Sequence, residues 1–506
     1  MVNGSRPGPH LCLNPTMSSP TDDSAPRLQP PGPAGTAHPT TSPGGTPGPT
    51  AGADGALGKG LKSRHLTMMG LGSAIGAGLF LGTGVGIRAA GPAVLVSYIV
   101  AGVIVVFVMQ MLGELAAARP DSGTFAAYGR QAFGHWAGFA LGWLYWFMLV
   151  MVMGAEITGA GAFMGRWFDV PGWIPGLVCV VFFSVVNLAA VRGFGEFEYW
   201  FAFIKVAVIV VFLVIGVLLI LGWLPGHSAV GLSNFSPFAP SGMSGVAAGL
   251  LAVAFAFGGI EIITIAAAES EDPGSSIARA VSAVIWRILV FYLGAVFIIT
   301  ALLPLSSLGE AQGAGDSPFT RVLAMAGIPG VTTIMEVVIV VALLSACNAQ
   351  IYATSRLVFS FAGSGDAPRA FRRVSRAGVP YIAVVCSLVF AFLSVALQVW
   401  GPENLIVILF NAVGGSLLAI WLMIALSEIR LRPRLEAEGS LTVRMWGYPV
   451  LPWVTVAALV ALAVLMLFDA TARDQVVTVV VVFAVLAAVG HLIGRRRDRT
   501  AATRGE

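Results

Sequence analysis

The chain has 506 residues, of which 57% are hydrophobic and only 11% are charged, and its mean hydropathy is +0.85. Soluble globular proteins carry about 25% charged residues, so this chain has too little polar surface to cover a soluble body. Its net charge of +4 does not come with a basic face on a soluble domain, which argues against a nucleic-acid-binding protein.

Residues 1–56 are rich in Pro, Gly, Ser and Thr and poor in aliphatic side chains. Such a segment cannot bury enough apolar area to offset the entropy of ordering, so we expect a disordered cytoplasmic tail. It lacks the apolar core and cleavage site of a secretory signal peptide. We predict a transmembrane domain over residues 57–497 and a short cytoplasmic tail over 498–506.

The rest of the chain is an all-α integral membrane protein by its pattern, with about twelve apolar windows of roughly 20 residues. No spacing of Cys and His suits a metal, and no hydrolase motif or phosphate-binding loop occurs, so we predict no enzyme activity, metal or cofactor. The windows lie at 66–88, 92–115, 136–165, 173–192, 197–223, 244–268, 283–304, 330–361, 381–398, 403–427, 450–470 and 475–494.

Basic residues gather before the first window and after the even-numbered ones, as the positive-inside rule requires of cytoplasmic loops. Both termini are therefore predicted to be cytoplasmic, in a multi-pass protein of the plasma membrane with the lipid bilayer as its surroundings. The largest basic groups are Lys59, Lys62 and Arg64; Arg369, Arg372, Arg373 and Arg376; Arg430, Arg432, Arg434 and Arg444; and Arg495, Arg496, Arg497 and Arg499.

The first window, Leu66 to Arg88, is interrupted by glycines at 70, 72, 76 and 78. Each glycine costs a helix interior about 1 kcal/mol relative to alanine. Secondary transporters place broken helices of this kind at the substrate site. A half-helix beginning near Gly76–Gly78 would point free N–H groups at a substrate carboxylate. The alternative is that the glycines only allow close helix packing.

The sixth window contains a second interruption at Gly258 and Gly259, followed by Glu261. Open carbonyl groups near Ser73–Ala74 and Phe255–Gly258 would accept hydrogen bonds from an ammonium group, so two broken helices suit a zwitterion. Similar breaks in the first and sixth spans are what an inverted five-plus-five repeat would produce.

Ionisable residues inside apolar windows are functional-site hypotheses, because burying a charge is costly. The candidates of this kind that we single out are Lys205, Glu261 and Glu156 inside windows, and Glu269 at the end of the sixth. Lys205 could instead snorkel to the interface, Glu261 could hydrogen-bond freed backbone groups, and Glu269 could be solvated at the cytoplasmic edge.

A series of short motifs runs along the chain in order: I-G-A-G-L-F-L-G-T-G from Ile75, A-G-P from Ala90, G-E-L-A from Gly113, G-T-F-A-A-Y from Gly123, G-W-L-Y-W from Gly142, G-E-F-E-Y-W from Gly195, A-A-A-E-S-E-D-P from Ala266, W-R-I from Trp286, S-R from Ser355 and G-D-A-P from Gly365. By these motifs the chain resembles, from Leu61 to about Arg497, amino acid permeases of the amino acid–polyamine–organocation superfamily. Within that superfamily, Gly259–Ser270 looks most like 4-aminobutyrate permeases, whereas Met153–Gly159 is similar to aromatic amino acid permeases.

The resemblance implies a leucine-transporter-like fold with two extra C-terminal helices, and import of an amino acid by proton symport. In that family pattern Phe255 is an aromatic gate, and Phe257 and Gly258 contribute carbonyl groups. Glu261 and Glu269 match acids of substrate binding or proton coupling, and Lys205 stands where sodium-driven relatives hold an ion. The residues matching the carboxylate and amine site are Ser73, Ala74, Gly76, Ala77 and Gly78.

Three alternatives stay open at this stage. An exchanger would need substrate on both sides of the membrane, and an amino acid sensor would need a signalling domain. A membrane-embedded enzyme would need a metal or nucleophile arrangement. We expect Lys205 to make transport independent of sodium, because its ammonium supplies the positive charge of the missing ion. The substrate and the oligomeric state are not fixed by the sequence.

Overall fold

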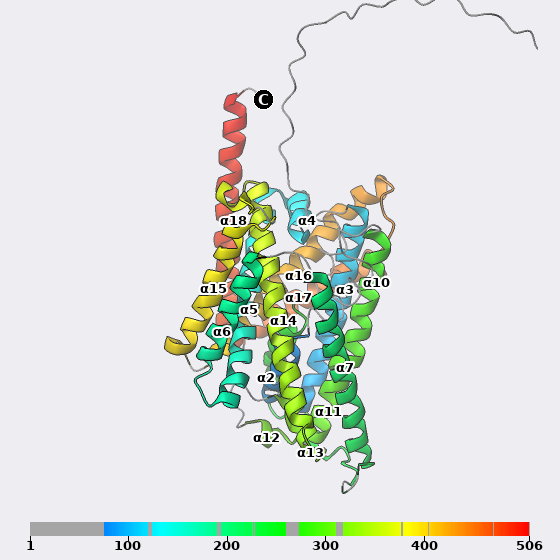
Figure 1. Ribbon diagram of the computed structural model, residues 1–506. Helices are drawn as coiled ribbons and strands as arrows, with labels where there is room; N and C mark the ends of the chain where they lie inside the picture. The colour runs from blue at the N-terminus through cyan, green and yellow to red at the C-terminus, as the bar shows by residue number, and fades with distance from the viewer. Residues whose placement is uncertain are drawn as a thin grey trace, which may run out of the picture. The chain divides into compact units, whose positions relative to one another are not determined.

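The computed structural model describes residues 75–119, 124–189, 194–224, 226, 228–259, 273–309, 317–375, 378–402, 404–468 and 470–504. They belong to one compact unit, and all regular structure within these ranges is helical (Figure 1). The predicted N-terminal tail, residues 1–56, lies outside the described residues.

The described helices follow the predicted apolar windows closely. They are η1 Gly78–Gly82, α2 Thr83–Ala90, η2 Gly91–Ala93, α3 Val94–Ala118, α4 Thr124–Phe133, α5 His135–Phe168, α6 Trp173–Ala189, α7 Phe194–Leu221, η3 Ser233–Phe235, α8 Gly242–Ala256, α10 Pro273–Trp286, η4 Arg287–Leu293, α11 Gly294–Leu302, α12 Leu305–Gly309, α13 Pro318–Met325, α14 Val331–Gly363, η5 Arg369–Arg372, α15 Tyr381–Trp400, α16 Leu405–Ala437, α17 Val450–Met466 and α18 Ala470–Arg504.

Among the described residues, 7 helical segments are long and apolar enough to cross a membrane. The first of them, Gly78–Ala118, changes direction at Gly91, whose φ of 63° is open to glycine but strained for other residues. Shorter apolar helices are α6, α8, the η4–α11 segment and α17. The count of twelve spans and the five-plus-five repeat remain predictions.

Two helices run about ten residues past the C-terminal ends of their apolar windows, and α10 begins about ten residues before its window. α16 continues to Ala437 rather than 427, and α18 continues to Arg504 rather than 494. Both extensions are rich in charged residues, and in α16 Glu428 pairs with Arg432 one turn later, at 3.5 Å. Figure 1 shows the end of α18 projecting past its neighbours. A window of hydropathy marks the lipid-embedded part of a helix, so it misses such polar continuations.

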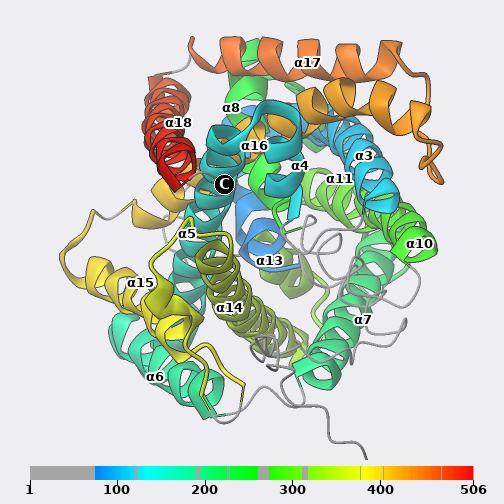
Figure 2. The same ribbon diagram turned by 90° about the horizontal axis from the view of Figure 1, so that it is seen from above.

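α5 lies at the centre of the helix packing. It contacts α14, α16, α18, α4, α6 and α15, and Figure 2 shows these helices arranged around it. The apolar part of α5 is 83% buried, whereas that of α18 is 11% buried. A charged side chain in this buried part of α5 therefore has neither lipid headgroups nor bulk water to solvate it, and its partner has to come from the protein.

Candidate functional site

The first interrupted helix begins where the glycines predict. Ile75 and Gly76 are not helical, and the helix runs from Ala77 through a π-helical stretch, η1, into α2. The carbonyl oxygen of Gly76 accepts hydrogen bonds from the N–H groups of Leu79 and Phe80, at 3.2 and 3.1 Å. The half-helix thus presents its N-terminal peptide groups inside the protein. Ser73 and Ala74 lie outside the described residues.

The carboxylate of Glu156 lies at this helix N-terminus. The Ala77 N–H donates to both Oε1 and Oε2 of Glu156, each at 3.1 Å, and the glutamate is only 3% exposed. A Cβ on Gly76 would lie 2.3 Å from Oε1, so glycine is needed for this approach. The positive end of the half-helix dipole favours the ionised form of this buried carboxyl group. Glu156 comes from α5, 79 residues further along the chain.

Lys205 completes the charge distribution around Glu156. It lies on α7, is fully buried, and interacts electrostatically with the Glu156 carboxylate. The structure therefore brings two of the predicted proton-coupling residues, from α5 and α7, to the start of the first half-helix. Burial of Lys205 argues against its snorkelling to the interface.

The second interruption faces the first. α8 ends at Ala256, and Phe257 to Gly259 form a turn in which Gly259 has a φ of 90°. A Cβ on Gly78 would lie 2.8 Å from the Cα of Ala256 and 3.1 Å from the carbonyl oxygen of Phe255, so η1 and the end of α8 are in direct contact. Close approach of the two broken segments depends on glycine at position 78.

The two predicted phenylalanines of α8 face different neighbours. Phe255 packs beside η1, and its ring centroid is 4.3 Å from that of Phe410 on α16. Phe257 packs between the rings of Tyr98 and Tyr292, at 6.0 and 5.2 Å. Phe255 is therefore the aromatic residue at the half-helix, and the Phe257 side chain has a packing role. Gly258 follows in the turn; Glu261 and Glu269 lie outside the described residues.

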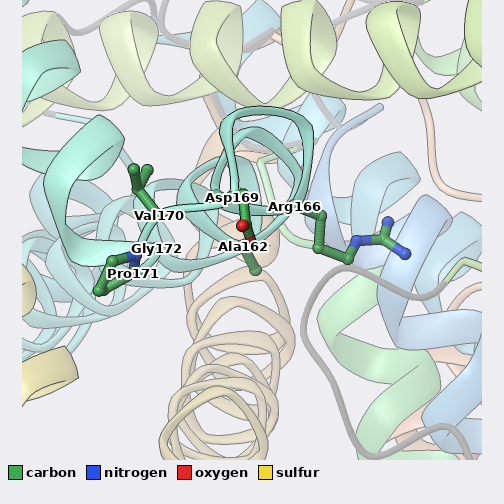
Figure 3. A pocket seen from close by; sticks show the side chains of 7 residues that line it. Ala162, Arg166, Asp169, Val170, Pro171 and Gly172 are labelled. Carbon is green, nitrogen blue, oxygen red and sulfur yellow. The ribbon is translucent and has the colours of Figure 1, made fainter.

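A surface hollow of about 430 Å³ lies at the C-terminal end of α5. Its lining includes Arg166, Asp169 and Gly172, and Figure 3 shows Arg166 extending away from the turn at Val170–Gly172. The turn is tight, because Asp169 adopts a left-handed φ of 54°. None of the predicted site residues that the structure describes lines this hollow.

A polar cluster around Asp366 was not predicted as a unit, although Asp366 belongs to the G-D-A-P motif. Its carboxylate accepts hydrogen bonds from Arg130 on α4 and from Ser364, and pairs with His135 on α5 at 2.7 Å and Arg497 on α18 at 3.3 Å. Burial alone would raise the pKa of Asp366, but the bond to His135 and the Arg130 guanidinium outweigh it and lower the pKa. The cluster ties the ends of four chain segments together.

A second unpredicted cluster joins Glu114 of α3 to Arg432 and Glu428 of α16. The guanidinium Nη1 of Arg432 is 2.6 Å from Glu114 Oε2. Glu114 lies inside an apolar window, in the G-E-L-A motif, and Glu428 precedes Arg432 by one helical turn. An intramembrane acid and a Glu–Arg pair at i,i+4 were the available sequence indications, but the contact spans 318 residues.

Comparison with known proteins identifies the fold family. The sequence profile described as "Amino acid permease" matches residues 65–501. The chain belongs to the amino acid permease family. It is 66% identical over 434 residues to the aromatic amino acid transport protein AroP of Corynebacterium glutamicum, which covers 85% of this chain and 94% of that protein.

Two further relatives are named for other substrates. The gamma-aminobutyric acid permease of Bacillus subtilis is 40% identical over 447 residues, covering 87% of this chain and 94% of that protein. The lysine-specific permease LysP of Escherichia coli is 41% identical over 391 residues, covering 75% of this chain and 79% of that protein. These relatives are amino acid transporters and not enzymes, and the permease is accordingly a multi-pass cell membrane protein of the amino acid–polyamine–organocation superfamily.

Proposed function

We propose that the permease imports an amino acid across the cytoplasmic membrane by proton symport with alternating access. In this proposal the chain has twelve spans, a leucine-transporter-like five-plus-five repeat with two further helices, and both termini in the cytoplasm. The observation that carries the mechanism is the Glu156 carboxylate bound at the N-terminus of the first half-helix.

The N–H groups at this terminus are the donors that a substrate α-carboxylate would use. Two carboxylates cannot share them while both are ionised, because like charges at this distance in a buried site repel strongly. Protonation of Glu156 would release the Ala77 N–H for the substrate. Binding of proton and substrate would then favour each other, which is the requirement for symport.

Lys205 has a complementary role in this mechanism. When Glu156 is ionised, the buried ammonium balances its charge. When Glu156 is protonated, the positive charge of Lys205 remains beside the half-helix and favours the incoming carboxylate. A fixed cation of this kind replaces a sodium ion, so transport is expected to be independent of sodium. Glu261 and Glu269 are further candidates for substrate binding or proton coupling.

The substrate that we favour is an aromatic amino acid. Support comes from the 66% identity to a relative named for aromatic amino acid transport, against 40% for the gamma-aminobutyric acid permease. The Phe255 and Phe410 rings beside the half-helix offer an aromatic side chain a surface for stacking. A 4-aminobutyrate-like zwitterion is the second candidate, since the C-terminal part of the sixth span resembles that group of permeases.

Uptake of labelled phenylalanine into proteoliposomes tests two parts of the proposal together, the coupling to protons and the import of substrate without exchange. The wild type should accumulate substrate above equilibrium when a proton gradient is imposed and should do so without internal substrate. The variant Glu156→Gln, which cannot ionise, should lose most of this accumulation and keep counterflow exchange. Glu336→Gln is the matched control, because Glu336 pairs with Arg166 and Trp167 at the C-terminal end of α5 and not with the half-helix.

Each alternative gives a different result in this assay. An obligate exchanger would move nothing into vesicles that lack internal substrate. Accumulation by Glu156→Gln equal to that of the wild type would refute the proposed coupling. Thermal-shift ranking of the common amino acids and 4-aminobutyrate identifies the substrate separately, because stabilisation grows with ligand concentration over Kd.

A further inference from the structure

The cluster of Glu114, Arg432 and Glu428 is buried and carries more negative than positive charge. Glu114 and Glu428 have no exposed surface, and Arg432 is 5% exposed. Arg432 Nη1 lies 2.6 Å from Glu114 Oε2 and 3.5 Å from Glu428 Oε1. Two carboxylates against one guanidinium leave a net charge of −1, which is costly in a buried site unless something neutralises it.

The hydrogen bonds divide unequally between the two acids. Oε2 of Glu114 accepts from Arg432 and from the N–H of Met445. Oε1 of Glu114 and both oxygens of Glu428 are buried without a hydrogen-bond partner. The two carboxyl groups are nevertheless within hydrogen-bonding reach of each other. Ionised carboxylates only accept hydrogen bonds, so this contact requires a proton on one of them.

We propose that Glu114 and Glu428 bind one proton between them, with Glu428 as its carrier, at a site separate from Glu156. Glu114 is the ionised partner, since its Oε2 already accepts two donors, one of them charged. Protonated Glu428 donates its O–H to Oε1 of Glu114, which gives a partner to Glu114 Oε1 and to one of the two Glu428 oxygens. The cluster then holds one carboxylate and one guanidinium and is neutral.

The charged groups around Glu428 support this assignment. Tyr448 lies under the Arg432 guanidinium, whose central carbon is 4.0 Å from the ring centroid, and burial raises the pKa of its hydroxyl, which stays neutral. Glu436 lies further along α16, where Arg444 pairs with it at 3.9 Å. Of the helices packed on α16, α8 and α17 carry no ionisable residue. α4 and α5 direct Arg130 and His135 to Asp366.

The helix α18 also packs on α16, and its charged residues lie towards its two ends. Among them, Arg497 binds Asp366 and Gly365. α5 also holds Glu156 at Ala77. Arg432 is therefore the cation that the described residues place on the acid pair. Within the described residues no third His, Cys, Asp or Glu joins the pair to make a metal-binding cluster.

The bound proton has a structural consequence. It allows α3, α16 and the segment around Met445 to meet in one hydrogen-bonded unit. Without the proton, the two acids repel each other in a buried site. The folded protein thus binds a proton that the unfolded chain gives up at neutral pH, so its stability should fall as the pH rises.

The test compares thermal unfolding of three purified full-length variants with the wild type in detergent, from about pH 6 to about pH 9. Glu428→Gln keeps a donor to Glu114 and has no proton to lose. Its midpoint should be less dependent on pH than that of the wild type, with the two curves diverging at high pH. Glu436→Gln changes an exposed acid two turns away and should keep the wild-type pH dependence. Glu114→Gln should lower the midpoint at every pH, because it removes the ionised acceptor.

Infrared spectroscopy reads the proton directly. The wild type should show the carbonyl band of a buried protonated carboxylic acid, and Glu428→Gln should lack it. The proposal is overturned if Glu428→Gln keeps both the band and the wild-type pH dependence. It is also overturned if sodium or potassium, compared with choline, supplies the stabilisation at high pH, since the cluster would then bind a metal cation. Neither readout depends on transport, so failure here leaves the proposed function untouched.

Discussion

Replacing Gly76 by alanine should disable the contact between the first half-helix and Glu156. An ideal Cβ at this position lies 2.3 Å from Glu156 Oε1, so the carboxylate has to move. Its two 3.1 Å contacts with the Ala77 N–H would then be lost. A hydrogen bond to a charged group contributes about 1.5–3 kcal/mol, and 1.4 kcal/mol corresponds to a factor of ten. We expect proton-driven accumulation of phenylalanine in proteoliposomes to fall about ten- to hundredfold.

Two further variants separate this effect from a general loss of helix packing. Gly82→Ala, in the same half-helix, adds a methyl group whose nearest neighbour is 3.5 Å away, so it should transport like the wild type. In the double variant Gly76→Ala/Glu156→Asp, the side chain is one methylene shorter and can retreat from the new methyl group. Its transport activity should be higher than the value expected if the effects of the two single substitutions simply added as free energies. Wild-type accumulation by Gly76→Ala, or strict additivity of the pair, would refute the reasoning.

Three other outcomes follow from the described contacts and the sequence. Asp366→Asn should cost about 2 kcal/mol of stability at neutral pH, because it breaks a buried anion's pairs with partly exposed cations. Because folding lowers the pKa of Asp366, the carboxylate stabilises the folded state fully at pH values above the ordinary Asp pKa of about 3.9. This stabilisation is lost as the pH falls through the lowered pKa. Thermal melts in acid should therefore show the loss in the wild type and not in Asp366→Asn. Uptake by the wild type should be unchanged when choline replaces sodium, and Lys205→Met should abolish it; strict sodium dependence of the wild type would contradict the assigned role of Lys205. Glu261→Gln should impair proton-driven accumulation more than counterflow exchange, and near-wild-type rates in both assays would count against a coupling role.

The helices could be located from the sequence because their cause is local. A run of apolar residues long enough for the bilayer must satisfy its own peptide groups, and a helix does so within the segment. The start of the first half-helix near Gly76 and the end of α8 just before Gly258 could also be predicted, since glycine weakens a helix wherever it occurs. The extended end of α16 could not, because its Glu428–Arg432 pair lies beyond the apolar window.

The partners of the charged residues could not be predicted. Glu156 was recognised as an intramembrane acid, but its place at the Ala77 N–H depends on how α5 is rotated against the first half-helix. The contact between Glu114 and Arg432 depends likewise on the packing of α3 on α16. Hydropathy says which residues are apolar, and it does not say which face of an almost uniformly apolar helix meets which neighbour.

The central claim is that the peptide groups of the interrupted helix hold the substrate carboxylate once Glu156 has released them. A cryo-electron microscopy structure of the permease with bound phenylalanine tests it most directly. The account predicts the substrate carboxylate at the N–H groups of Ala77 and Gly78, with the Glu156 side chain displaced from the half-helix. Density in which Glu156 still accepts from Ala77 while the substrate carboxylate binds elsewhere, or in which both segments run as continuous helices, would contradict it.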